Sequence, residues 1–319
     1  EFTSILDKFN FDSDDSDLVH RDKDIIDVKN IEELSKVLGS IPESSTLSII
    51  LDDELSIAYD TEKVYNAGLA QNLIDQGLNF FEVLDTLKPI LENGSIKKVT
   101  YDAKKLLMQT LKNGINISGI YFDAFIGAYL LEPTTDKYDL EQLMYDYLRI
   151  DVSDADAADL LLLSDAMMDR LRESGMLTLY EEVEHPLIRV LAQMELDGFK
   201  VDKSMLENLG EEFSYKIDEY TNEIYALADE KFNINSPKQL GVVLFDNLKL
   251  PVIKKTKTGY STDIRVLEQL LPYHPIIQKI IDYRQIMKLK STYVDGLLSV
   301  IDPKDGRIHS SFNQTVTAT

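Results

Sequence analysis

Residues 232–262 read FNINSPKQLGVVLFDNLKLPVIKKTKTGYST. Ser236 followed by Pro237 predicts the start of a helix, because serine can accept a hydrogen bond from first-turn amides and proline fits the first helical position. The apolar run then gives way to residues 254–262, which contain three lysines and several hydroxyl side chains but no acidic or aliphatic residue. Gly259 permits a turn with positive φ. The stretch therefore predicts a helix followed by a cationic connector.

This connector belongs to the basic end of an acidic chain. The 319 residues include 33 Lys/Arg and 56 Asp/Glu, which gives a formal net charge of −23. Residues 231–319 alone hold 13 Lys/Arg against 7 Asp/Glu. Such asymmetry is typical of a protein in which one end meets a polyanion. A solvated surface with chance clustering of charge explains it equally well.

Composition excludes several classes of protein. The chain has no cysteine and four scattered histidines, so neither a disulfide framework nor a zinc site is expected. No run of about 18 apolar residues is present, and the first residues, EFTSILDKFNFDSDDSD, lack the basic and apolar regions of a signal peptide. We expect a soluble, cytoplasmic monomer with no membrane partner.

Hydrophobic periodicity separates two parts of the chain. Isoleucine- and valine-rich runs bounded by turns predict strands at 25–28, 47–53, 55–60 and 97–101. Apolar positions three and four apart predict helices between and after these strands, at 70–91 and 122–131. Beyond about residue 138 the strand signal ends, and helical runs such as 203–232 follow until a strand-like alternation at 307–314.

The fold class follows from this order. Strands alternating with helices over 25–175 predict an α/β domain with a mixed sheet. Residues 1–24 are polar and acidic, and we expect them to form a flexible lead-in. Residues 176–319 are expected to form a mostly helical unit.

Four segments carry side chains suited to phosphate. Besides 254–262, these are 288–292 (KLKST), the helix start in 232–239 and the polar segment 311–319. Lysine supplies charge, hydroxyls bond phosphate and sugar oxygens, and a helix N-terminus attracts anions. Ser236 alone is explained as well by capping, but four such segments within ninety residues favour nucleic acid. The candidate DNA-binding residues are Asn235, Ser236, Lys255, Thr256, Lys257, Thr258, Tyr260, Ser261, Thr262, Lys288, Lys290, Ser291, Thr292, Asn313, Gln314 and Thr315.

The same segments carry a family resemblance. Residues 232–298, together with FNQTVTAT at 312–319, closely resemble the bacterial DNA polymerase I family, the family A polymerases. HPLIRVLAQMELDGFKVD at 185–202 looks like the entry to that family's thumb. GINISGIYFDAFIGAYLLEP at 114–133 resembles its 3′–5′ exonuclease domain, which has an RNase H-like α/β fold.

The resemblance implies different roles for two parts of the chain. Residues 25–175 would form the exonuclease-like domain, and residues 176–319 the helical thumb with the first strand of the palm. The thumb would grip primer–template duplex DNA, with 254–262 at its tip, KLKST along the backbone, and Asn313 to Thr315 near the primer. The family's palm aspartates and its fingers helix with Lys and Tyr are not found up to Thr319. We therefore expect Mg²⁺-dependent, template-directed synthesis in replication and repair only of a longer parent polymerase, and no catalysis or cofactor in this fragment.

The exonuclease motifs are incomplete. The family supplies Asp-x-Glu at a strand end, an Asp on the next helix and Tyr-x-x-x-Asp on a later helix. Asp52 and Glu54 match the first pair, although an acidic β-turn explains them as well. Leu106 occupies the second position. Asp156 fits the third, but Val152 replaces its tyrosine.

We expect a degenerate exonuclease domain that binds no metal, with Asp52, Glu54 and Asp156 as vestiges. Two other hypotheses stay open. One is an active, metal-dependent 3′–5′ exonuclease for proofreading. The other is an acidic helical scaffold that does not bind nucleic acid.

Overall fold

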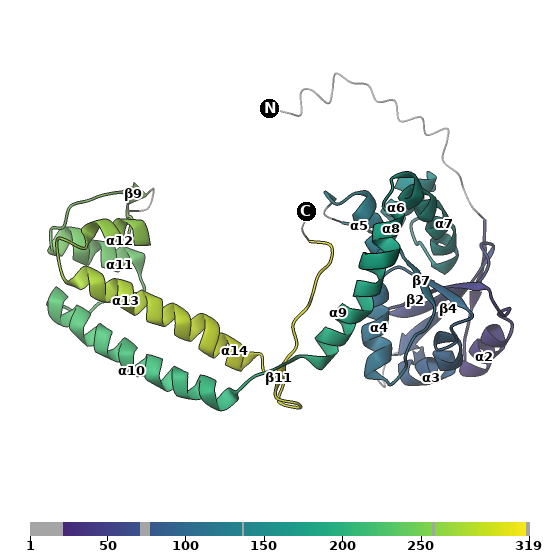
Figure 1. Cartoon of the computed structure of the whole chain (residues 1–319), viewed down its shortest axis with the longest axis horizontal. Helices are drawn as coiled ribbons and strands as arrows, with labels where there is room; N and C mark the ends of the chain where they lie inside the picture. Colours follow the sequence, from purple (N-terminus) through teal and green to yellow (C-terminus); the bar gives the residue numbers. More distant parts are fainter. Residues whose placement is uncertain (1–21, 71–76, 136, 257–258, 317–319) are drawn as a thin grey trace, which may run out of the picture. The chain divides into compact units, whose positions relative to one another are not determined.

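The computed structural model describes residues 22–70, 77–135, 137–256 and 259–316 (Figure 1). The chain forms two compact units. The first comprises Glu1–Asp197 together with Ser311–Thr319, and the second comprises Gly198–Ser310.

A mixed seven-stranded sheet organises the first unit. Its strands lie in the order β1 (Asp24–Asp27), β4 (Lys63–Ala70), β3 (Glu54–Ala58), β2 (Thr46–Leu51), β6 (Lys97–Thr100) and β7 (Ile120–Asp123), with β5 (Leu78–Asn79) paired to β4. The β2–β3–β4 meander is antiparallel, whereas β1, β5, β6 and β7 each pair in parallel. Leu47, Ile49 and Ile57 are fully buried on one face of the sheet. Ser48 and Ser56 point to the other face and are buried too, so the central strands are covered on both faces.

Helices cover the sheet. They are α2 (Ile31–Gly39), α3 (Phe80–Leu91), α4 (Ala103–Lys112), α5 (Ala124–Leu131), α6 (Leu140–Leu148), α7 (Ala157–Glu173), the short α8 (Leu177–Leu179), the π-helical turn η2 (Tyr180–Glu184) and α9 (His185–Asp197). Helix α7 packs on β2, β3 and β6, while α9 packs along α4. Pro186 occupies the first turn of α9, directly after the π-helical turn, where proline is tolerated.

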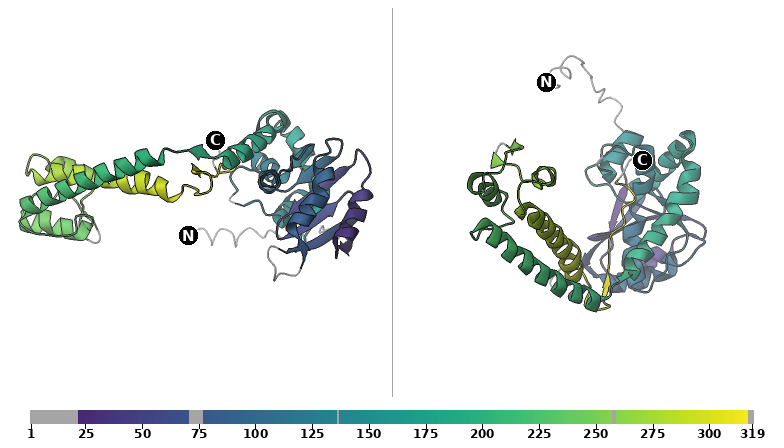
Figure 2. Two further views of the ribbon diagram at one scale, coloured as in Figure 1. Left: turned by 90° about the horizontal axis from the view of Figure 1, so that it is seen from below. Right: turned by 60° about the vertical axis from the view of Figure 1, so that its left-hand side comes forward.

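The second unit is a long helical pair with a cap at one end. Helix α10 (Lys203–Ala228) lies along α13 (Ile276–Lys288) and the π-helical η4 (Leu289–Asp295), which leads into α14 (Gly296–Ser299) (Figure 2). The cap contains α11 (Pro237–Gly241), the π-helical η3 (Val242–Asn247), α12 (Ile264–Leu270) and the hairpin of β9 (Lys255–Thr256) with β10 (Gly259–Tyr260). A separate pair joins β8 (Phe199–Lys200) to β11 (Arg307–Ile308). The core of the second unit includes Ile224, Leu244, Leu267 and Ile280.

The predicted fold class, an α/β unit followed by a mostly helical one, is confirmed. The helix start predicted at Ser236 is confirmed, because the Ser236 side chain caps α11. Asn30 caps α2 in the same way. The helix predicted from residue 70 begins only at Phe80, after the Asn79 cap, and residues 71–76 lie outside the described chain. The strand predicted over 307–314 contains only Arg307 and Ile308.

The predicted domain limits also differ from the limits of the compact units. The first unit extends past residue 175 to Asp197, because α9 packs against α4. Most of the predicted lead-in lies outside the described residues, but Asp24 already belongs to β1. The division into an exonuclease-like domain and a thumb therefore stays a prediction about function. No helix in the described part of the chain is long and apolar enough to cross a membrane.

Candidate nucleic-acid interface

The cationic connector forms a short hairpin. Lys255 pairs with Tyr260 and Thr256 with Gly259, while Lys257 and Thr258 lie outside the described residues. Gly259 has a φ of 141°, a value that favours glycine. The Tyr260 ring anchors the hairpin, because it packs 4.8 Å from the Phe245 ring and its hydroxyl lies 2.8 Å from Asp246 Oδ1. Lys255 and Thr256 are left exposed at the tip.

Residues from three separate segments line one cavity beside this hairpin. The cavity has a volume of about 910 Å³ and is bounded by residues 235–238, Val242, Thr256, residues 259–263 and Arg284. Lysine, arginine, amide and hydroxyl side chains therefore meet around one concave surface. Asp263 is the one acidic residue of this lining.

Internal hydrogen bonds hold several of these groups. Ser236 Oγ accepts from the Gln239 amide at 3.4 Å, and Asn235 Nδ2 donates to the Tyr283 hydroxyl at 3.0 Å. Ser261 Oγ donates to Asp263 Oδ2 at 2.8 Å, and Thr262 Oγ1 accepts from Arg284 at 3.1 Å. Ser261 and Thr262 are only 5% and 6% exposed, so these hydroxyls shape the loop rather than face solvent.

Helix α13 continues the polar surface away from the cavity. Arg284 and Lys288 are four residues apart and so share a helix face, and exposed Ser291 and Thr292 follow in η4. The Lys290 ammonium lies 2.8 Å from Asp295 Oδ2, which compensates its charge. Sequence reasoning missed Arg284, although its helical spacing from Lys288 could have found it.

Sequence reasoning also missed Lys238. It is exposed in the first turn of α11, two residues after the Ser236 cap, and it lines the cavity. Lys238 lies inside the polar segment 232–239, and this position could have identified it as a further candidate.

The fourth predicted segment belongs to the first unit. Glu195 Oε1 accepts from the Phe312 amide at 2.8 Å, and Lys104 Nζ lies 2.8 Å from the same carboxylate while also donating to the Phe312 carbonyl. Gln314 Nε2 donates to the Glu184 carbonyl at 3.1 Å and to its Oε2 at 3.0 Å. Asn313, Gln314 and Thr315 line a smaller cavity of about 220 Å³ beside Asp102 and Asp123. They thus lie in a different compact unit from the other candidates.

The exonuclease candidates are engaged in ordinary structural contacts. Asp52 begins the tight turn between β2 and β3, where its amide donates to the Glu54 carbonyl at 3.0 Å, and its carboxylate pairs with Lys105 of α4. Glu54 is exposed at the start of β3. Asp156 caps α7, and its carboxylate lies 2.6 Å from Lys23 Nζ.

Asp52, Glu54 and Asp156 do not gather into one group of metal ligands in the described part of the chain. A two-metal site needs several carboxylates converging on ions about 3.5–4 Å apart. Among the described residues, the one group of three possible metal ligands within 4.8 Å is Asp302, Asp305 and His309, which excludes Asp52, Glu54 and Asp156. The Asp302 and Asp305 carboxylates accept hydrogen bonds from backbone amides of their own turn. His309 Nε2 lies 3.0 Å from Asp305 Oδ2, so local bonding explains why these three residues lie together.

Lys98 and Asp123 are buried ionisable residues of the first unit with shifted pKa values. Lys98 is fully buried and donates to the Asn93 and Ser118 carbonyls, and burial lowers its pKa to about 8. Burial also raises the pKa of Asp123 to about 7, against the opposing effect of the Ile126 and Ala103 amides that bond its carboxylate. Neither group lies among the predicted DNA-binding residues.

Two family sequence models match the chain. One, described as DNA polymerase family A, matches residues 203–319, and the other, described as DNA polymerase I, ribonuclease H-like domain, matches residues 61–157. The chain belongs to the family A DNA polymerases. The sheet-containing first unit is accordingly an RNase H-like exonuclease-type domain, as the resemblance implied.

Similar proteins agree with this membership. DNA polymerase I of Bacillus subtilis is 33% identical over 348 aligned residues, covering 100% of this chain and 38% of that protein. DNA polymerase I of Geobacillus stearothermophilus is 41% identical over 247 residues, covering 70% of this chain and 28% of that protein. The chain therefore spans less than two fifths of the length of these polymerases.

A solved structure also resembles the chain. It is the POL domain of Pol1 from M. smegmatis in complex with DNA primer–template and dNTP, with 31% sequence identity and a TM-score of 0.72. The match covers 92% of this chain and 53% of that one. Both compact units therefore have counterparts in a family A polymerase.

Proposed function

We propose that this chain binds primer–template duplex DNA as part of a bacterial DNA polymerase I. The helical second unit acts as the thumb, and the whole polymerase carries out template-directed, Mg²⁺-dependent DNA synthesis in replication and repair. One observation carries the proposal: residues 235–238, the hairpin and Arg284 line the same cavity. The Mycobacterium relative, whose structure contains primer–template DNA, supports it.

The chemistry of this surface suits a sugar–phosphate backbone. Lys238, Lys255 and Lys288 are exposed and have no carboxylate partner within 4.0 Å among the described residues, so each can neutralise a phosphate. Thr256 and Asn235 add exposed hydroxyl and amide groups, which also bond phosphate and sugar oxygens. Such contacts position a duplex without reading its sequence. We therefore propose sequence-independent binding.

In this proposal the exonuclease-like domain is structural. Lys105 and Lys23 already compensate the carboxylates of Asp52 and Asp156. A lysine ammonium at each position supplies the positive charge that a metal ion would otherwise bring. The domain then serves as a packed support instead of a nuclease.

Fluorescence anisotropy with a labelled primer–template duplex tests the thumb surface. Lys288→Gln should weaken binding equally for two duplexes of unrelated sequence, because it removes a backbone contact. Lys290→Gln should weaken it less, since Asp295 already compensates that charge. Lys112→Gln, an exposed lysine on α4, is the matched control and should change nothing. Equal effects of all three substitutions would contradict the proposed surface.

The same protein allows a test of the nuclease hypothesis. Labelled single-stranded DNA incubated with Mg²⁺ or Mn²⁺ should keep its length. Metal-dependent shortening that Asp52→Ala abolishes would establish an active 3′–5′ exonuclease and refute the structural role of this domain.

A further inference from the structure

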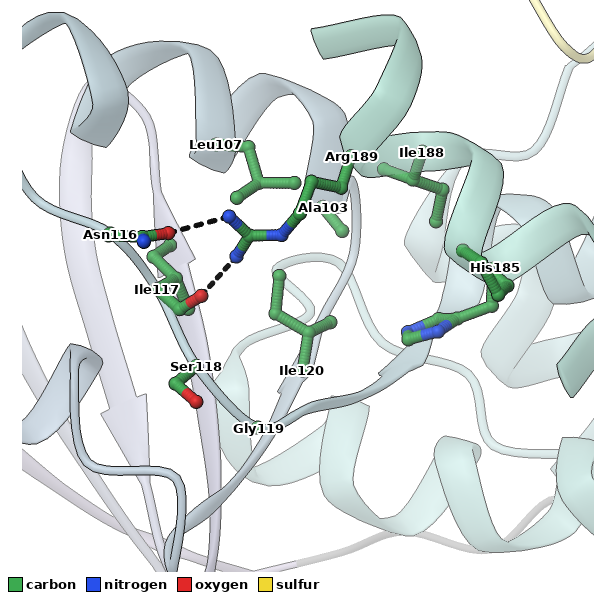
Figure 3. A pocket seen from close by; sticks show the side chains of 11 residues that line it. Ala103, Leu107, Asn116, Ile117, Ser118, Gly119, Ile120, His185, Ile188 and Arg189 are labelled. Carbon is green, nitrogen blue, oxygen red and sulfur yellow. Dashed lines mark hydrogen bonds between the residues drawn. The ribbon is translucent and has the colours of Figure 1, made fainter. Parts of the chain in front are cut away.

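A second cavity lies in the first unit, between α4, the chain entering β7 and α9 (Figure 3). Its volume is about 460 Å³, within the range of about 300–1,000 Å³ typical of small-molecule sites. Ala103 and Leu107 form one wall, residues 116–120 the second, and residues of α9 the third. None of the DNA-binding candidates or exonuclease candidates lines it.

Arg189 brings a positive charge to this cavity. Its guanidinium donates to Asn116 Oδ1 at 2.6 Å and to the Ile117 carbonyl, and both of these acceptors are neutral (Figure 3). Among the residues that the structure describes, no carboxylate lies within 4.0 Å of this guanidinium. A guanidinium has five N–H donors, so some remain for a ligand. In a chain with a net charge of −23, a half-buried arginine without an acidic partner is a specific feature.

The rest of the lining excludes negative charge. No aspartate or glutamate is among the lining residues. Glu92 lies outside the lining, and its Oε1 accepts a hydrogen bond from the Asn116 backbone amide at 3.1 Å. The cavity therefore combines one positive charge with neutral walls.

His185 contributes a second polar atom. Its Nε2 is buried and has no hydrogen-bond partner, and the ring packs 5.5 Å from the Tyr180 ring. Burial lowers the pKa of the imidazole, so the ring is neutral at pH 7. A buried, unpaired nitrogen at a cavity wall costs free energy unless a ligand or water bonds it.

We propose that this cavity binds a small organic anion, a carboxylate or a phosphate monoester that carries an apolar body. The anionic group bonds Arg189, and the apolar body packs against Leu107, Ile120 and Ile188. Arg189, Ile120 and His185 line the same cavity, and Ile120 lies between the arginine and the histidine in the view of Figure 3. This site is separate from the proposed DNA surface and does not depend on that function.

Calorimetric titration of the whole chain with phenyl phosphate, benzoate and inorganic phosphate tests the proposal. At least one of the two organic anions should bind saturably, and inorganic phosphate should bind more weakly because it has no apolar body. Arg189→Met should weaken the binding about tenfold or more. Arg172→Met removes an exposed arginine of α7 paired with Asp169 and should leave the binding unchanged.

A second variant distinguishes a specific loss of binding from misfolding. Ile120→Phe keeps the charge of Arg189 but fills the cavity, so it should also abolish binding while leaving the melting temperature close to the parent value. Arg189→Lys should retain partial binding. The proposal is overturned if neither organic anion binds, if inorganic phosphate binds as tightly as the organic anions, or if Ile120→Phe binds them normally. Primer–template binding should be unaffected by Arg189→Met, which separates this site from the thumb.

Discussion

Arg284 on α13 donates hydrogen bonds to both the carbonyl and the Oγ1 of Thr262, the last residue of the cationic connector. This fork ties the long helical pair to the loop that follows the hairpin. Because the guanidinium and the buried threonine form one contact, the connector and the helix face that carries Lys288 present a common surface. Arg284 is therefore a positioning residue for the proposed interface.

Replacing this arginine should loosen the loop. Arg284→Met leaves the buried Thr262 groups without their donor, which should cost about 1–3 kcal/mol of unfolding free energy. Urea unfolding of the whole chain measures the loss. Arg265→Met, at an exposed position on α12, is the control and should cost less than about 0.5 kcal/mol. Equal stabilities of the two variants would show that the fork contributes nothing.

Glu195 should hold the segment around Phe312 in place. The Glu195→Gln substitution removes the charge that attracts Lys104 and weakens the contact to the Phe312 amide. Hydrogen exchange of a peptide spanning residues 311–316 should become faster, since the amide loses a charge-assisted bond. Glu181→Gln, exposed in η2, should leave the exchange rate unchanged. Unchanged exchange in Glu195→Gln would contradict the anchoring role.

Lys23 should stabilise the first unit through two carboxylates. Its ammonium pairs with Asp156 and with the fully buried Asp159, so Lys23→Met removes this compensating charge from both carboxylates. We expect a loss of about 3 kcal/mol in unfolding free energy. Adding Asp159→Asn to this variant should restore part of the stability, because one buried charge is removed. A double variant no more stable than Lys23→Met alone would argue against this electrostatic cause.

Lys98 should give the first unit a specific pH dependence. Its pKa is about 8 in the folded protein, against an ordinary value of 10.5 in the unfolded chain. Between these values the unfolded state binds more protons, so the stability should rise as the pH increases from 8 toward 10.5. Chemical unfolding across this window measures the slope. Lys98→Met should remove this rise, and a variant with the same slope as the parent would show that Lys98 does not titrate abnormally.

Local rules explain which parts of the fold could be predicted. The start of α11 at Ser236 and Pro237 depends on residues next to one another, and the sequence was sufficient to find it. The contact between Arg284 and Thr262 joins residues 22 positions apart, and the pairing of Asp52 with Lys105 spans 53. Such partners are decided by how the elements pack, so periodicity could not reveal them.

The candidate site likewise combines features that the local sequence indicates with contacts that only the packing decides. Residue type and spacing named the hairpin and Lys288 as candidates, and Lys255, Thr256 and Lys288 are exposed in the structure. Residue type and spacing did not indicate that Ser261 and Thr262 would bury their hydroxyls in internal bonds. Nor did they place Asn313 to Thr315 in the first unit, where a carboxylate and a lysine from two helices hold the neighbouring Phe312.

The salt dependence of duplex binding tests the central proposal most directly. With about four to six phosphate contacts, the affinity for primer–template DNA should fall about a hundredfold or more between 50 and 200 mM salt. The Lys255→Gln/Lys288→Gln double variant should lower the slope of log K against log salt by about 2. The Lys36→Gln/Lys112→Gln double variant, which loses the same charge from exposed positions of the first unit, should keep the parent slope. Identical slopes for all three proteins would contradict DNA binding by the thumb surface.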